Sequence, residues 1–87
     1  MFFKEHSVNS VHSTLYTQLI AGLKQARLDA DLTQVELAER LDKPQPYIAK
    51  IEGCERRLDI AEFVEYAAAL GHEPDALFKA LLVDVKL

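Results

Sequence analysis

The sequence predicts an all-α domain built of five helices. Apolar residues recur at steps of three and four along most of the chain, which is the period of a helix with one buried face. Two capping boxes, at residues 33–36 and 59–62, mark helix starts, and glycine or proline separates the helical segments. The 87 residues are expected to form one domain, with residues 1–12 as a flexible segment, 13–82 as the folded domain and 83–87 as a tail.

The first two helices are predicted over residues 13–30 and 34–41. The first has one apolar stripe, formed by Leu15, Leu19, Leu23 and Ala26. At the start of the second, Thr33 can accept a hydrogen bond from a free backbone N–H while Glu36 reaches back to the backbone of Thr33. The apolar face of this short helix then consists of Leu37, Ala38 and Leu41.

The third helix is predicted over residues 45–52, with Ile48 and Ile51 on one face and Gly53 as a left-handed stop. The fourth helix is capped by Asp59, and Gly71 closes it. Its predicted apolar face consists of Ile60, Phe63, Val64, Ala67 and Leu70.

The fifth helix is predicted to start at Pro74, because proline suits the first turn of a helix. It carries Leu77, Phe78, Leu81 and Leu82. Beyond it, residues 83–87 alternate weakly between apolar and polar and fit either a helical extension or a strand.

The net charge of −4 comes from one part of the chain. Residues 58–87 hold six acidic side chains and two lysines, whereas residues 1–57 hold eight basic and eight acidic side chains. The negative total therefore does not exclude a basic face on the first part of the chain. No apolar run approaches the roughly 20 residues of a membrane span, and residues 1–13 lack the features of a secretory signal. A cytoplasmic protein is expected, in agreement with a single cysteine, Cys54.

The link between the second and third predicted helices is only about three residues, DKP. Two short helices joined so tightly cross at a large angle, which is the geometry of a helix-turn-helix. The segments LTQVELAERL and PQPYIAKIE, followed by ERRLDIAEF, resemble the Cro and phage-repressor type of helix-turn-helix regulators, whose fold is lambda-repressor-like. The resemblance covers about residues 14–82 and includes polar positions, which helical packing alone does not dictate.

The resemblance implies that Gln45, Pro46 and Lys50 read DNA bases. An amide side chain can bond to an adenine edge in the major groove, whereas Pro46 offers only an apolar contact, for example with a thymine methyl group. Prolines at a helix start remove an N–H that is unpaired anyway, so Pro44 and Pro46 can stiffen this entry. Taken without the resemblance, Gln45 equally fits a helix cap and Lys50 a solvated lysine.

Several other side chains are implied as phosphate contacts, namely Thr33, Gln34, Lys43, Tyr47, Arg56 and Arg57. Gln34 is also implied to brace the reading helix. For Tyr47 the alternative is a cover over the helix junction, and for one of the two arginines it is a brace on the fourth helix. This chain departs from the pattern at Cys54, which stands where glycine is usual because Gly53 comes one place early. Aspartates stand at two further helix ends where glycine is common, Asp31 and Asp42.

Two other features concern the scaffold. The resemblance implies a partly buried ion pair between Arg27 and Glu52, which joins the first helix to the third. Independently, the end of the chain carries more apolar surface than one small domain readily hides. We therefore expect a homodimer interface formed by Leu77, Phe78, Leu81, Leu82 and Val85.

Other chemistries find no support in the residue spacing. His6, His12, His72 and Cys54 show no metal-ligand spacing, no glycine-rich phosphate loop is present, and Cys54 has no neighbouring base. The sequence predicts no enzyme, cofactor or metal site. It predicts a double-stranded DNA-binding transcription regulator, a repressor acting as a homodimer on a palindromic operator. The alternatives are an antitoxin or restriction-modification controller with the same domain, or a module that binds a protein partner.

Overall fold

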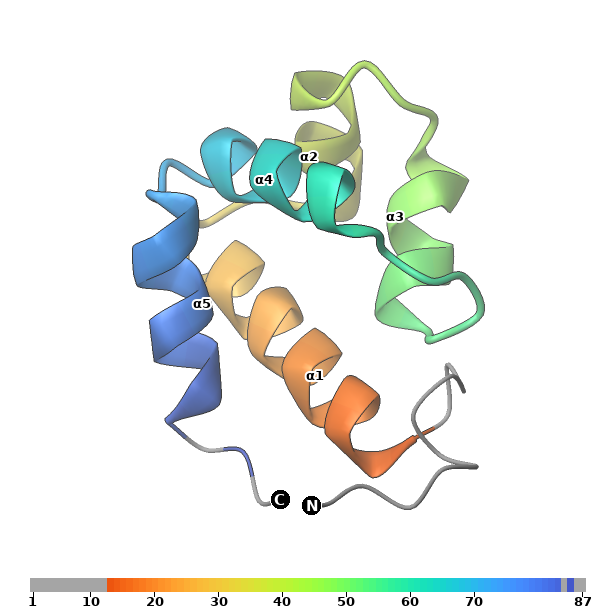
Figure 1. The fold of residues 1–87 in the computed structure, drawn as a ribbon. Helices are drawn as coiled ribbons and strands as arrows, with labels where there is room; N and C mark the ends of the chain where they lie inside the picture. Colours follow the sequence, from red (N-terminus) through yellow and green to blue (C-terminus); the bar gives the residue numbers. More distant parts are fainter. Residues whose placement is uncertain (1–12, 84, 86–87) are drawn as a thin grey trace.

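The structure is a computed structural model that describes residues 13–83 and 85 of the chain. Helices make up most of these residues. The five predicted helices are confirmed, each within about two residues of its expected limits. Residues 1–12, predicted as a flexible segment, and residues 84, 86 and 87 of the predicted tail lie outside the described residues. The helices shown in Figure 1 are α1 (Thr14–Asp29), α2 (Gln34–Arg40), α3 (Gln45–Glu52), α4 (Ile60–Ala69) and α5 (Pro74–Leu82).

Side chains at the helix starts supply the missing hydrogen bonds. Both predicted capping boxes are present: the Glu36 backbone N–H donates to Thr33 Oγ1 over 3.0 Å, and the Glu62 N–H donates to Asp59 Oδ1 over 2.7 Å. The remaining starts use Ser13, which caps α1, and prolines in the first turns of α3 and α5. Local sequence therefore sets where each helix begins.

Left-handed residues end four of the helices. Asp31, Asp42 and Cys54 have φ angles of 59°, 56° and 58°, and Gly71 has 83°. The predicted left-handed stop at Gly53 is wrong, because Gly53 has a φ of −85° and Cys54 takes the left-handed conformation. The reason is the closure of α3, in which the N–H of Glu55 donates to the Lys50 carbonyl over 2.8 Å and so places the reversal one residue later.

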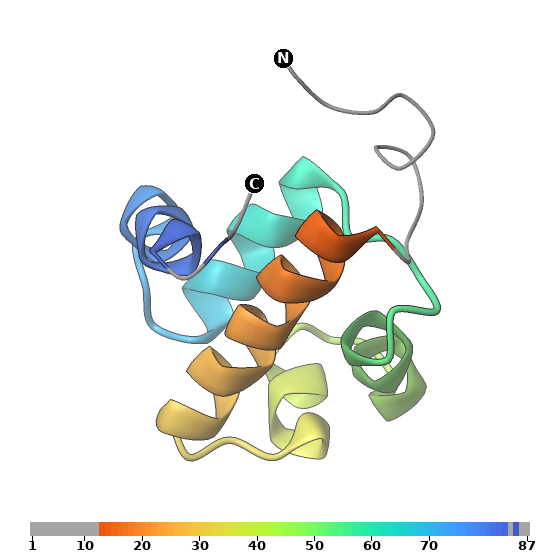
Figure 2. The same ribbon diagram turned by 90° about the horizontal axis from the view of Figure 1, so that it is seen from below.

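α1 lies across the middle of the domain. Figure 2 shows α5 on one side of it and α3 on the other, and α1 contacts both. Its buried residues are Ile20, Leu23 and Arg27. The predicted stripe is wrong in part, since Leu15, Leu19 and Ala26 are only half-buried. Because α1 contacts α3 on one side and α5 on the other, its buried face is wider than a single stripe and is centred nearer to Ile20.

The core-facing side of α4 also differs from the prediction. Ile60 and Val64, expected in the core, are 83% and 48% exposed. Tyr66, which the apolar pattern missed, is fully buried. The residues in or against the core are Phe63, Tyr66, Ala67 and Leu70, which keep the helical spacing with a large aromatic ring in the middle.

α5 divides its apolar residues between the core and the surface. Leu77 and Leu81 are buried, whereas Phe78 and Leu82 are 46% and 44% exposed. α5 approaches α1 closely at Gly22, where an added Cβ atom would lie 2.6 Å from Leu81 Cδ2. After Leu82 the chain turns, and the Val85 N–H donates to the Leu82 carbonyl over 3.2 Å. Among the described residues, no helix combines the length and apolar character that a membrane crossing requires.

Candidate nucleic-acid interface

α3 presents one face to the core and the other to solvent. Ile48 and Ile51 are fully buried, whereas Pro46 and Lys50 are exposed one turn apart and Gln45 is half-buried at the start of the helix. The turn before α3 is closed by the Lys43 N–H, which donates to the Ala38 carbonyl over 2.9 Å. α2 and α3 therefore pack on each other at the crossing expected of a helix-turn-helix (Figure 1).

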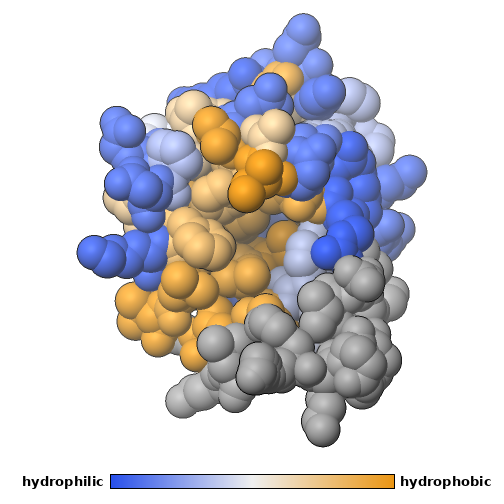
Figure 3. Space-filling model, in the orientation of Figure 1, coloured by the Kyte–Doolittle hydropathy of each residue, from blue (hydrophilic) through white to orange (hydrophobic). Residues whose placement is uncertain are grey.

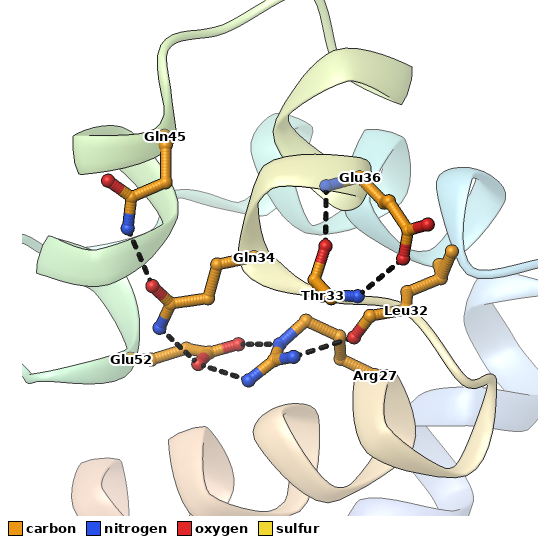
Figure 4. Close-up of polar contacts among 7 residues, drawn as sticks. All are labelled: Arg27, Leu32, Thr33, Gln34, Glu36, Gln45 and Glu52. Carbon is orange, nitrogen blue, oxygen red and sulfur yellow. Dashed lines mark hydrogen bonds and ion pairs between the residues drawn. The ribbon is translucent and has the colours of Figure 1, made fainter.

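A continuous hydrogen-bonded chain connects Gln45 to the core (Figure 4). Gln45 Nε2 donates to Gln34 Oε1 over 2.7 Å, and Gln34 Nε2 donates to Glu52 Oε1 over 2.9 Å. We call these three residues the amide relay. At its inner end, Arg27 donates to both oxygens of Glu52, over 2.6 and 3.0 Å. A third bond from Arg27 goes to the Leu32 carbonyl over 2.6 Å.

The buried carboxylate sets the direction of every bond in the amide relay. An ionised carboxylate can only accept, so Gln34 must turn its NH₂ group toward Glu52 and its oxygen toward Gln45. Gln45 must then donate to Gln34. The Oε1 atom of Gln45 and its second N–H then remain available to a ligand as one acceptor beside one donor.

Arg27 and Glu52 form the ion pair that joins α1 to α3. Their side chains are only 7% and 3% exposed, so both charges are removed from water. The hydrogen bonds to Glu52 raise the pKa of Arg27. Because a buried charge needs a partner, neither side chain can move without a large cost in stability.

Tyr47 lies between two cations beside α3. The Lys43 Nζ is 5.2 Å from the centre of the Tyr47 ring, and the Arg56 guanidinium carbon is 4.8 Å from it. Arg56 also donates two hydrogen bonds to Glu62, over 3.0 and 2.8 Å. Arg56 is thus the arginine that braces α4. These bonds, followed by the one that the Asp59 backbone N–H donates to Glu62, lower the pKa of Glu62 to about 2.

The loop between α3 and α4 rests on Tyr16. The Tyr16 hydroxyl donates to the Arg56 carbonyl over 3.3 Å and accepts from the Leu58 N–H over 2.9 Å. The exposed Arg57 guanidinium lies 5.4 Å from the centre of the Tyr16 ring. Sequence reasoning missed this role of Tyr16, since no local pattern pairs residues about forty positions apart. It also treated Glu62 only as a cap and missed its bond to Arg56.

The structure brings some of the predicted site residues together and keeps others apart. Gln34 and Gln45 are in contact, and Lys43, Tyr47 and Arg56 meet at one ring. Thr33 is exposed beside Gln34, and its oxygen accepts from the Glu36 N–H. No cluster of His, Cys, Asp and Glu that could hold a metal ion occurs within residues 13–83 and 85, and burial raises the pKa of Cys54.

The comparisons with known proteins agree on one family. Residues 23–77 match the helix-turn-helix family HTH_3. A solved structure described as an XRE-family like protein from Pseudomonas syringae pv. tomato str. DC3000 is similar to this chain, with 39% sequence identity and a TM-score of 0.77. The similarity covers 87% of this chain and 93% of that one. The search of curated proteins found no match.

The buried ion pair predicts a strong coupling between Arg27 and Glu52. Replacing Glu52 by alanine leaves the Arg27 cation buried without its carboxylate, so we expect a loss of about 3 kcal/mol in the free energy of unfolding. Replacing Arg27 by methionine in the same protein removes the stranded charge, so the double variant should lose less than the sum of the single losses. Urea denaturation of the four proteins measures the coupling. Strictly additive losses would contradict it.

The Arg56–Glu62 contact predicts a specific loss of stability in acid. The folded pKa of Glu62 is lowered from 4.5 to about 2, so its stabilisation is complete above pH 4.5 and disappears as the pH falls toward 2. Glu62→Gln should therefore show a shallower fall of melting temperature across that range than the parent protein. Glu73→Gln, at an exposed position with no side-chain cap bond, is the control and should keep the parent slope. Equal slopes for Glu62→Gln and the parent would refute the assignment.

Proposed function

The chain belongs to the helix-turn-helix family HTH_3, and on this premise we propose that it is a repressor that binds a palindromic operator as a homodimer. Family membership gives the broad class, which is a DNA-binding transcriptional regulator. The observation that carries the proposal is the amide relay, because it holds a half-exposed glutamine in one orientation at the start of the solvent-facing helix. A fixed orientation suits a side chain that must present its acceptor and donor to one base edge.

Gln45 suits an adenine in the major groove. Adenine presents an acceptor, N7, beside a donor, the N6 amino group, whereas guanine presents two acceptors. The acceptor and the remaining N–H of Gln45 match adenine and leave guanine with one unsatisfied contact. Pro46 adds an apolar contact that suits a thymine methyl group, and the exposed Lys50 supplies a donor one turn further on.

Phosphate contacts surround this reading face in the proposal. Arg57 and Lys43 supply positive charge, and Thr33, Gln34 and Tyr47 offer hydroxyl or amide donors. For Arg56 we take the alternative role of a brace, because its two bonds to Glu62 make it a support for the loop that carries Arg57. We assign Arg57 as the main phosphate contact of this loop.

The homodimer is proposed to form through the exposed apolar residues of α5 and the turn after it. Leu77 and Leu81, expected in the interface, lie in the core and drop out of the proposed surface. The surface consists of Phe78, Leu82 and Val83, the half-buried Val85, and the exposed Val64 on the neighbouring helix α4. Two copies joined here would present two reading helices to successive major grooves about 34 Å apart.

In this proposal the protein acts in the cytoplasm without chemistry of its own. Bound at an operator, it occludes polymerase.

The apolar surface on α4 and α5 also favours a second candidate function, which is a module that binds a protein partner and no DNA. A salt titration separates the two, since phosphate contacts release counterions and make DNA affinity fall with salt.

Base readers and phosphate contacts should fail differently when they are replaced by alanine. Gln45→Ala is expected to lose about 1 to 3 kcal/mol of binding free energy on the cognate duplex and almost nothing on a scrambled one. Arg57→Ala should weaken binding to both duplexes alike and reduce the salt slope by about one. Fluorescence anisotropy titrations at two salt concentrations measure these values. Equal losses for Gln45→Ala on the two duplexes would show that Gln45 reads no base.

The proposed dimer surface is tested by polar substitutions at exposed positions. Leu82→Ser and Val83→Ser should shift the protein toward monomer in sedimentation at tens of micromolar, because each removes apolar area from the shared surface. Val35→Ser is the matched control, since Val35 is 51% exposed on α2 and should leave the association unchanged. A parent protein that stays monomeric at that concentration, with and without operator duplex, would exclude the homodimer.

A further inference from the structure

An apolar groove of about 460 Å³ runs between α1, α4 and α5. Figure 3 shows hydrophobic side chains gathered over a hollow on this face of the molecule. One wall is formed by Tyr16, Leu19, Ile20 and Leu23 of α1, and Phe63 and Phe78 lie opposite with their rings in edge contact, 5.9 Å apart at 80°. A volume of this size accommodates a large aromatic side chain with its neighbours.

We propose that this groove is the docking site of residues 1–12 of the same chain, with Phe2 or Phe3 seated between α1 and α5. This segment has the sequence MFFKEHSVNSVH and joins the domain at Ser13, the cap of α1. The α1 wall begins three residues later, at Tyr16, and extends about 10 Å to Leu23 at a helical rise of roughly 1.5 Å per residue. Ten Cα-to-Cα steps lead from Phe3 to Ser13 and can span roughly 33 Å, so the segment is long enough to turn back along the wall.

Proximity favours this occupant over a second copy of the chain, and both the segment and the rim carry charges of either sign. Docking in cis closes a loop of only about ten residues, and the entropy of closing a loop rises slowly with its length. The rim of the groove carries the carboxylates of Asp59 and Asp75 together with Arg57, and the segment places Lys4 and Glu5 directly after its two phenylalanines.

Docking of the segment does not depend on DNA binding and goes beyond the proposed function. It covers Phe78, which the segment would take from the proposed dimer surface, and leaves exposed Leu82 and Val83, the two positions changed in the dimer test. The proposed dimer surface then keeps its outer part. Failure of the dimer test would therefore leave the docking of the segment untouched, and the reverse also holds.

A tryptophan placed in the segment reports on the groove, because the chain contains no tryptophan of its own. In the full chain, Phe3→Trp is expected to emit at shorter wavelength than the free indole and to resist quenching by acrylamide. Both signals should be independent of protein concentration. Adding Phe78→Ala to Phe3→Trp should shift the emission to longer wavelength and restore quenching, with circular dichroism showing that the helices persist.

Two further variants complete the test. Asp75→Lys, at an exposed rim position, should also restore quenching because it places a cation beside Lys4, and it leaves the core untouched. Val35→Ala, on α2 and outside the groove, should change nothing. A fully quenchable tryptophan at every concentration overturns the proposal. Protection that appears only as concentration rises also overturns it and assigns the groove to a second copy, and protection that survives both Phe78→Ala and Asp75→Lys overturns it as well.

Discussion

The buried carboxylate of Glu52 is the constraint on which the first three helices depend. It lies on α3, accepts two bonds from Arg27 on α1 and one from Gln34 on α2, and is almost fully removed from water. A charge in that position is tolerated only while its partners stay in place. The three helices therefore share one geometric requirement, and the crossing of α2 and α3 includes the hydrogen bond from Gln34 to Glu52 as well as apolar packing.

The same carboxylate acts at the surface through the amide relay. Because Glu52 cannot donate, the orientation of two successive amides is decided in the core, and the outer one offers a fixed acceptor and donor to solvent. In the proposed function, stability and base recognition are thus coupled in one chain of bonds. A surface glutamine without such a chain would rotate freely and present either end to a base, which would weaken discrimination between purines.

Features that depend on neighbouring residues could be predicted from the sequence, and those that depend on distant ones could not. Capping boxes and helix-starting prolines act within one turn, so helix limits followed directly. The facing of α4 was wrong at Ile60 and Val64 because contacts with other helices decide which side of an apolar helix is buried. Gln34, Gln45 and Glu52 were assigned roles through a resemblance to a known family. No such guide distinguished Arg56 from Arg57 as the partner of Glu62, because that choice depends on how the loop folds.

Tyr16 links the apolar groove to the loop between α3 and α4. Its ring forms part of the apolar groove, while its hydroxyl holds the Arg56 carbonyl and the Leu58 N–H, and Arg57 lies over its face. The loop that carries the arginines is therefore built on a side chain of the groove wall. Any occupant that shifts Tyr16 must also shift the backbone between Arg56 and Leu58, because both hydrogen bonds would otherwise break inside a half-buried site. The backbone on either side of Arg57, in the loop after α3, is consequently held by a side chain of the apolar groove.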